Sequence, residues 1–147
     1  MKRMVLFAAI FVILAAGAWV RLAPTDTALW HTDPVTSAAA DCTVLPGTGG
    51  ARAACTVPGA PGEVLARLDA IALATPRTHR MAGSAEEGRI TWVTRSLIWG
   101  FPDYTTAAAA PLPEGTRLDV HARLRFGGSD LGVNAARLED WLSRLMP

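Results

Sequence analysis

The chain has 147 residues, a length that suits one compact domain. Its formal net charge is +1, with 14 basic and 13 acidic residues. This balance argues against a dedicated nucleic-acid binder, which normally carries a basic face. Electrostatics alone therefore names no partner.

An uncharged apolar run at residues 4–20 follows Lys2 and Arg3. Its length of about 17 residues lies at the short end of what crosses a bilayer as a helix. The two cations favour a cytoplasmic N-terminus, and Trp19 suits the far membrane interface. We therefore predict a membrane anchor over residues 1–22. It would make the chain a single-pass protein of the inner (cytoplasmic) membrane, with its C-terminal domain on the periplasmic or extracytoplasmic side.

A cleaved signal peptide is the alternative interpretation of this segment. Ala16-Gly17-Ala18 places small residues at the spacing that a signal peptidase accepts. The apolar run continues past this candidate cut through Trp19 and Val20, which favours the uncleaved anchor. Both interpretations export the domain.

Cys42 and Cys55 are the only cysteines. In an exported chain, two cysteines this close in sequence favour a disulfide, which would stabilise the fold by on the order of 3 kcal/mol. Two free or buried thiols are the alternative. Neither cysteine has a second ligand at a spacing typical of zinc sites, so we predict no metal.

Residues 23–61 are rich in Pro, Gly, Thr and Ala and show little periodicity, so we predict an extended arm or loop. Trp30 in this arm precedes His31 and the turn-forming pair Asp33-Pro34. An arm pinned to the domain by Trp30 explains the pattern. A functional use of His31 with Asp33 is the alternative.

We predict that residues 62–147 form one α+β domain. Apolar residues at helical spacing favour a helix over residues 62–75, which Pro76 would end, and a second helix over residues 131–146. Ser129 or Asp130 would cap the second helix.

Four strands are predicted between these helices, at residues 77–82, 89–98, 104–110 and 116–126. The last strand alternates apolar and polar residues, which indicates one buried and one wet face. Short turns between the strands favour an antiparallel meander. The predicted fold class is therefore α+β: an N-terminal transmembrane helix followed by a small antiparallel sheet packed against two helices.

The polar residues offer no familiar catalytic signature. His31, His79 and His121 are far apart in sequence, and no metal-binding spacing, nucleophile elbow, phosphate loop or Cys-x-x-Cys pair occurs. We predict no cofactor. The polar face of the last strand, with Arg123 and Arg125, is either solvated or able to bind an anion, and Arg95 would share it if the strands pair in the simple register.

The most specific pattern is Phe101-Pro102-Asp103 together with the run from Arg125 to Asn134 and the later Arg137. This pattern resembles the C-terminal signature of the family catalogued as domain of unknown function 1499, over residues 77–145. In that family a strand ending in Arg-x-Gly leads to Ser-Asp, here Ser129 and Asp130, then to Gly-Val-Asn and a further basic residue. The resemblance supports the domain and leaves its function open.

The chain departs from the family pattern at three positions. Tyr104 stands where the family usually has a second acid, and Ala122 and Leu124 stand where it has serines. A site built from those groups would be incomplete here. Capping and fold-locking therefore explain Ser129-Asp130 with Asn134 and Arg137 better than a binding site does.

Three functional hypotheses follow, with the bilayer and a membrane protein as the predicted partners. The first is an accessory or assembly subunit of a membrane protein complex, without enzymatic activity. The second is a carrier or sensor of an apolar ligand held by Trp92, Ile98 and Phe126. The third is a hydrolase that pairs His121 or His79 with Asp103, Asp119 or Asp130. The residues proposed for a partner or as the motif are Trp30, Phe101, Asp103, Arg125, Ser129, Asp130, Asn134 and Arg137.

Overall fold

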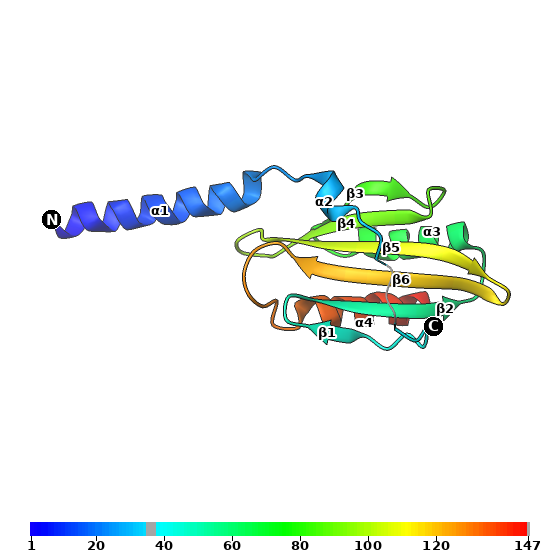
Figure 1. The fold of residues 1–147 in the computed structure, drawn as a ribbon. Helices are drawn as coiled ribbons and strands as arrows, with labels where there is room; N and C mark the ends of the chain where they lie inside the picture. Colours follow the sequence, from blue (N-terminus) through cyan, green and yellow to red (C-terminus); the bar gives the residue numbers. More distant parts are fainter. Residues whose placement is uncertain (35–37, 147) are drawn as a thin grey trace.

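A computed structural model describes residues 1–34 and 38–146, so residues 35–37 of the predicted arm and residue 147 lie outside the description. It confirms the α+β class (Figure 1). The helices are α1 (Lys2–Leu22), α2 (Thr27–Trp30), α3 (Pro61–Leu73) and α4 (Val133–Leu145). The strands are β1 (Leu45–Gly47), β2 (Gly50–Val57), β3 (Thr78–Ser84), β4 (Arg89–Arg95), β5 (Pro102–Leu112) and β6 (Gly115–Leu124).

All strands form one antiparallel sheet in the order β1-β2-β6-β5-β4-β3. β3 to β6 make the predicted meander, in which each strand pairs with the next along the chain. α3 and α4 lie together on one face, which we call the inner face, and the chain that follows α1 crosses the opposite, outer face (Figure 1).

The alternation predicted for the last strand is confirmed in β6. Leu118, Val120 and Ala122 are buried on the inner face, against the helices. Arg123 pairs across the sheet with Tyr104 on the outer face, and the register places Arg95 on that face as well. The outer face is not simply wet, however, because the arm covers its centre.

The irregular arm predicted for residues 23–61 ends earlier than expected, since β1 and β2 belong to the sheet. β2 lies between β1 and β6, and its residues Ala51, Ala53 and Cys55 are buried on the inner face. Small side chains give a weak apolar signal in sequence. They are suited to this position because α4 packs directly against β2.

The predicted disulfide joins Cys42 to Cys55, with a distance of 4.4 Å between their Cα atoms. The backbone beside it runs along β2, because Cys42 N–H donates to the Ala54 carbonyl at 2.8 Å and Thr56 N–H donates to the Ala40 carbonyl at 3.0 Å. The disulfide therefore fixes the far end of the arm to an edge of the domain.

Two tryptophans form the centre of the core between sheet and helices. Trp92 of β4 and Trp141 of α4 are fully buried and meet edge to face, with ring centroids 5.6 Å apart. Trp92 Nε1 donates to the Asp69 carboxylate at 2.8 Å, and Trp141 Nε1 donates to Thr75 Oγ1 at 2.8 Å. Both indole N–H groups are thus satisfied, which removes the cost of burying them.

We predict that Trp141→Ala lowers the free energy of unfolding by about 3–5 kcal/mol, because it empties the centre of the core. Urea unfolding of the detergent-solubilised full chain, followed by circular dichroism, measures this change. Glu139→Ala, at an exposed position of the same helix, is the control and should change stability by less than about 0.5 kcal/mol. Equal effects of the two substitutions would contradict the packing described here.

Candidate functional site

One end of the sheet carries exposed apolar side chains, and α1 leaves the domain at this same end (Figure 1). In the loop between β4 and β5, Leu97 and Ile98 are 73% and 75% exposed and Trp99 is 48% exposed. Leu131, before α4, is 91% exposed. We call these two loops, which carry the exposed apolar side chains, the apolar end of the domain.

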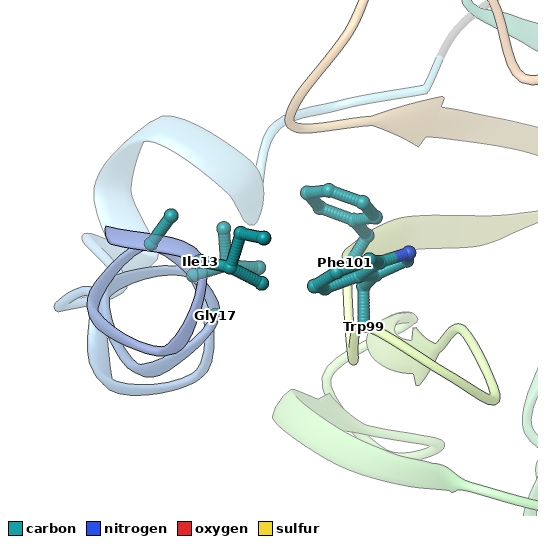
Figure 2. A pocket seen from close by; sticks show the side chains of 6 residues that line it. Ile13, Gly17, Trp99 and Phe101 are labelled. Carbon is teal, nitrogen blue, oxygen red and sulfur yellow. The ribbon is translucent and has the colours of Figure 1, made fainter. Parts of the chain in front are cut away.

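α1 contacts the apolar end directly. Ile13, Ala16, Gly17 and Val20 of α1 form one wall of an open cleft of about 250 Å³, and Trp99 and Phe101 form the other. Figure 2 shows the two aromatic rings facing Ile13 and Gly17 across this cleft.

The contact is close at Gly17, where an added Cβ would lie 4.0 Å from Cε3 of Trp99. Arg21, in the last turn of α1, donates to the Ile98 carbonyl at 3.1 Å and holds the loop beside the helix. Gly17 lies five residues before the end of α1, a rise of about 7.5 Å along the helix axis. The loop therefore reaches past the end of α1 and along its side.

Four of the predicted motif residues meet at the start of α4. Arg137 donates to Asn134 Oδ1 at 2.6 Å and to Asp103 Oδ2 at 3.3 Å. Asp130 accepts from the backbone N–H of Asn134 at 3.0 Å and from that of Gly132 at 3.3 Å. Asp130 thus satisfies an amide at the start of the helix, although Gly132 is the residue at the N-cap position.

Burial is the main cause of the pKa shifts of the two residues that form the ion pair of this cluster. Burial raises the pKa of Asp103, an effect that the Arg137 guanidinium opposes. Burial lowers the pKa of Arg137, and the Asp103 charge opposes that shift. The hydrogen bonds that Asp130 accepts from Asn134 and Gly132 outweigh its burial and hold its pKa below the usual range. Because its charges pair with each other, the cluster ties β5 to α4.

The other motif residues lie elsewhere. Ser129 Oγ accepts from Leu131 N–H at 3.2 Å and shapes the loop before α4. Phe101 packs near Phe126, with centroids 6.2 Å apart, at the apolar end. Trp30 and Arg125 belong to the outer face of the sheet.

Trp30 anchors the arm on that outer face. Its ring stacks on Tyr104 at a centroid distance of 4.1 Å, and the Arg123 guanidinium lies 5.4 Å from the same ring. Arg123 also donates to the Trp30 carbonyl at 2.6 Å and to Thr32 Oγ1 at 3.0 Å. Tyr104, although on the outer face, is fully buried as a result.

A chain of hydrogen bonds continues from Trp30 to His31. Thr106 Oγ1 donates to the Trp30 carbonyl, so the Thr91 hydroxyl, 2.9 Å away, must donate to Thr106. Thr91 can then only accept from His31 Nδ1 at 2.8 Å, while His31 Nε2 accepts from Arg89 at 3.3 Å. This arrangement requires neutral His31, in agreement with the lowering of its pKa by burial and by Arg89.

Arg125 holds the beginning of the arm. It donates to the Pro24 carbonyl at 2.8 Å, to Thr25 Oγ1 at 3.3 Å and to the Tyr104 hydroxyl at 3.2 Å. Thr25 Oγ1 is itself 2.9 Å from that hydroxyl. The polar face of the last strand therefore binds carbonyl and hydroxyl groups of the chain's own arm.

The residues of the apolar-ligand hypothesis lie in different environments. Trp92 is fully buried in the core, and Ile98 is 75% exposed in the loop between β4 and β5. Phe126 packs near Phe101, and the Arg125 guanidinium lies 4.9 Å from its ring. They do not line a common cavity.

The residues of the hydrolase hypothesis do not come together either. His121 pairs across strands with Arg52 and is flanked by Arg123, while Asp119 is paired with Arg117 at 2.8 Å. Asp103 lies on the inner face. Burial is the main cause that lowers the pKa of His121 to about 4, and Arg123 and Arg52 add to it.

Some interacting groups escaped the sequence analysis. Asp69 of α3 binds Arg80 of β3 through both carboxylate oxygens while accepting from Trp92. The threonines of the outer face and the cleft beside α1 were also missed. All of these interactions join residues that are separated in sequence, and no local residue spacing predicts such contacts.

A model of the family described as "Protein of unknown function (DUF1499)" matches residues 31–145. No curated protein matches the chain. Among solved structures, the chain is similar to the crystal structure of DR_A0006 from Deinococcus radiodurans, with 17% sequence identity and a TM-score of 0.40. That similarity covers 63% of this chain and 90% of the other.

We predict that Trp30→Ala lowers the free energy of unfolding by about 2–3 kcal/mol, because it removes the stack on Tyr104 and the contact with Arg123. The matched control is Leu29→Ala, at the preceding and 66% exposed position, which should have little effect. Urea unfolding of both variants measures the difference. If the two lose equal stability, Trp30 does not anchor the arm.

We predict that His121 makes the fold sensitive to acid. Its pKa is about 4 when folded and 6.5 ordinarily, so between these pH values the unfolded chain binds the extra proton. Stability contributed by neutral His121 is therefore present above pH 6.5 and lost as the pH falls toward 4. After discounting for partial exposure, the loss should be about 1–2 kcal/mol.

Unfolding free energies measured across this pH range test the point. His121→Gln should flatten the acid limb relative to the wild type, whereas His79→Gln, which removes an exposed imidazole, should not. An unchanged slope in His121→Gln would show that other groups cause the acid sensitivity.

Proposed function

We propose that this chain, which belongs to the DUF1499 family of proteins of unknown function, is an accessory module held in the cytoplasmic membrane by α1. In this proposal the domain lies on the extracytoplasmic side. The cleft between α1 and the apolar end binds a transmembrane helix of a partner protein.

Three features support membrane anchoring by an uncleaved α1. The most apolar 18 residues of this 21-residue helix have a mean hydropathy of 2.3, and none of them is buried inside the protein. The helix is about 32 Å long at 1.5 Å per residue, close to the thickness of the hydrocarbon core. Its contact with the domain also begins at Ile13, before the candidate cleavage site after Ala18.

The observation that carries the proposal is the cleft itself. Ile13, Ala16, Gly17 and Val20 recur at spacings of three and four, so they share one face of α1. Small residues such as Ala16 and Gly17 allow a neighbouring helix to approach closely inside a membrane. Trp99 and Phe101 give this face a second, aromatic wall.

A helix is a better occupant than a small ligand for two reasons. The cleft is open to the surroundings of α1 rather than enclosed by the domain (Figure 2), and its walls are almost wholly apolar. In a bilayer the only neighbours at that depth are lipid chains and other transmembrane segments. A helix would bury both walls at once and would place the domain beside its partner.

The sharpest test fills the cleft. Gly17→Leu adds a side chain toward Trp99 and should release the protein from any complex that uses this face. Ala15→Leu is the matched control, because at 100° per residue it points about 160° away from Gly17 around the helix. Both variants add apolar bulk to the same turn of α1, so they should insert into the membrane equally well.

The measurement is the fraction of tagged protein that migrates as a high-mass species after mild detergent extraction of native membranes. We expect the wild type and Ala15→Leu to migrate in that species and Gly17→Leu to migrate as a lone protein. A photo-crosslinker at Val20 should label one protein in the wild type. Lipid adducts alone, or equal behaviour of the two leucine variants, would contradict the proposal.

A further inference from the structure

We propose that a second, basic pocket beside α1 binds the phosphate group of an anionic phospholipid. The inference shares with the proposed function only the placement of α1 in the bilayer. It does not depend on a partner helix.

The pocket has a volume of about 490 Å³ and lies where the end of α1 meets the sheet. Three arginines contribute to its lining: Arg21 from α1, Arg77 before β3 and Arg95 at the end of β4. Its remaining lining residues are Thr78, His79, Ser96, Leu97 and Gly100. No carboxylate of the described residues lines this pocket, so its lining carries a net positive charge.

The three guanidinium groups are fixed by backbone carbonyls rather than by acids. Arg21 donates to Ile98 O at 3.1 Å, Arg77 to Arg95 O at 3.0 Å and Arg95 to Gly100 O at 2.9 Å. Each guanidinium has five N–H donors, and these bonds use only one of them. The others remain for a ligand, in a geometry that a phosphate can accept.

The ion pairs of the described residues use other arginines. Arg80, Arg117, Arg137 and Arg144 each lie beside an aspartate. The three arginines of the pocket differ from these, because each donates to a backbone carbonyl instead of a carboxylate. Three like charges held together in this way favour binding of an anion.

The position of the pocket decides which phosphate it meets. Arg21 ends the apolar helix, so the pocket lies at the level of the lipid headgroups when α1 spans the bilayer. Leu97, which lines the pocket, is 73% exposed, and Trp99 contacts α1 at Gly17, about 6 Å deeper along the helix than Arg21. A phospholipid has its phosphate at the membrane surface and its acyl chains below. One lipid molecule can therefore place its phosphate in the basic pocket and its acyl chains along the apolar side of α1.

The test uses the full chain in nanodiscs made of phosphatidylcholine with a minor fraction of phosphatidylglycerol. Native mass spectrometry of protein released from the discs counts the phosphatidylglycerol retained on it. We expect the lipid retained on the protein to be enriched in phosphatidylglycerol over the bulk fraction. In Arg77→Gln this enrichment should fall about fivefold, the factor expected for one arginine near an anionic surface. Arg95→Gln should have a similar effect.

Arg144→Gln is the matched control, because it removes the same charge near the C-terminus, at the far end of α4 from α1. Circular dichroism confirms that each variant is folded. Equal enrichment in Arg77→Gln and Arg144→Gln would overturn the inference, as would displacement of the lipid by millimolar inorganic phosphate, which would indicate a site for the soluble ion. Failure of the protein to enter the discs would instead contradict anchoring by α1.

Discussion

The stack of Trp30 on Tyr104 determines where the domain stands relative to α1. Only a short segment separates the end of α1 at Leu22 from this stack, and Arg125 holds that segment through the Pro24 carbonyl. A chain fixed so soon after the helix has little freedom to swing. The apolar end is consequently held against the side of α1, and both proposed binding surfaces depend on this placement.

Besides forming ion pairs with aspartates, arginine has a second recurrent use in this structure, which is to bind backbone carbonyls. Arg123 and Arg125 bind the carbonyls of the arm on the outer face, and Arg21 and Arg95 bind those of the loop between β4 and β5. A guanidinium can bind a carbonyl and still present donors elsewhere, because its five N–H groups point in fixed directions. The near-neutral net charge does not reveal this distribution, so composition alone named no partner.

The sequence predicted the elements that have a strong local period and missed those that depend on distant contacts. The alternation from Leu118 to Ala122 identified β6, and helical spacing identified α3 and α4. β2 escaped because Ala51 and Ala53 are small, although α4 packs on them. The sequence predicted that Trp30 pins the arm to the domain, but not that its ring stacks on Tyr104, because these two residues are far apart in sequence and no spacing relates them. The cleft at Gly17 was missed for the same reason.

The signature residues acquire a physical role once both loops are placed. Asp103 is the second residue of β5, two positions after Phe101, and Arg137 lies in α4 shortly after the exposed Leu131. Their partly buried ion pair therefore ties together the two loops of the apolar end, and breaking it leaves each charge without this partner. Without this tie, loops that expose large apolar side chains would be free to collapse onto the domain. The ion pair thereby fixes the start of β5, directly after Trp99 and Phe101, the two residues that face α1 across the cleft.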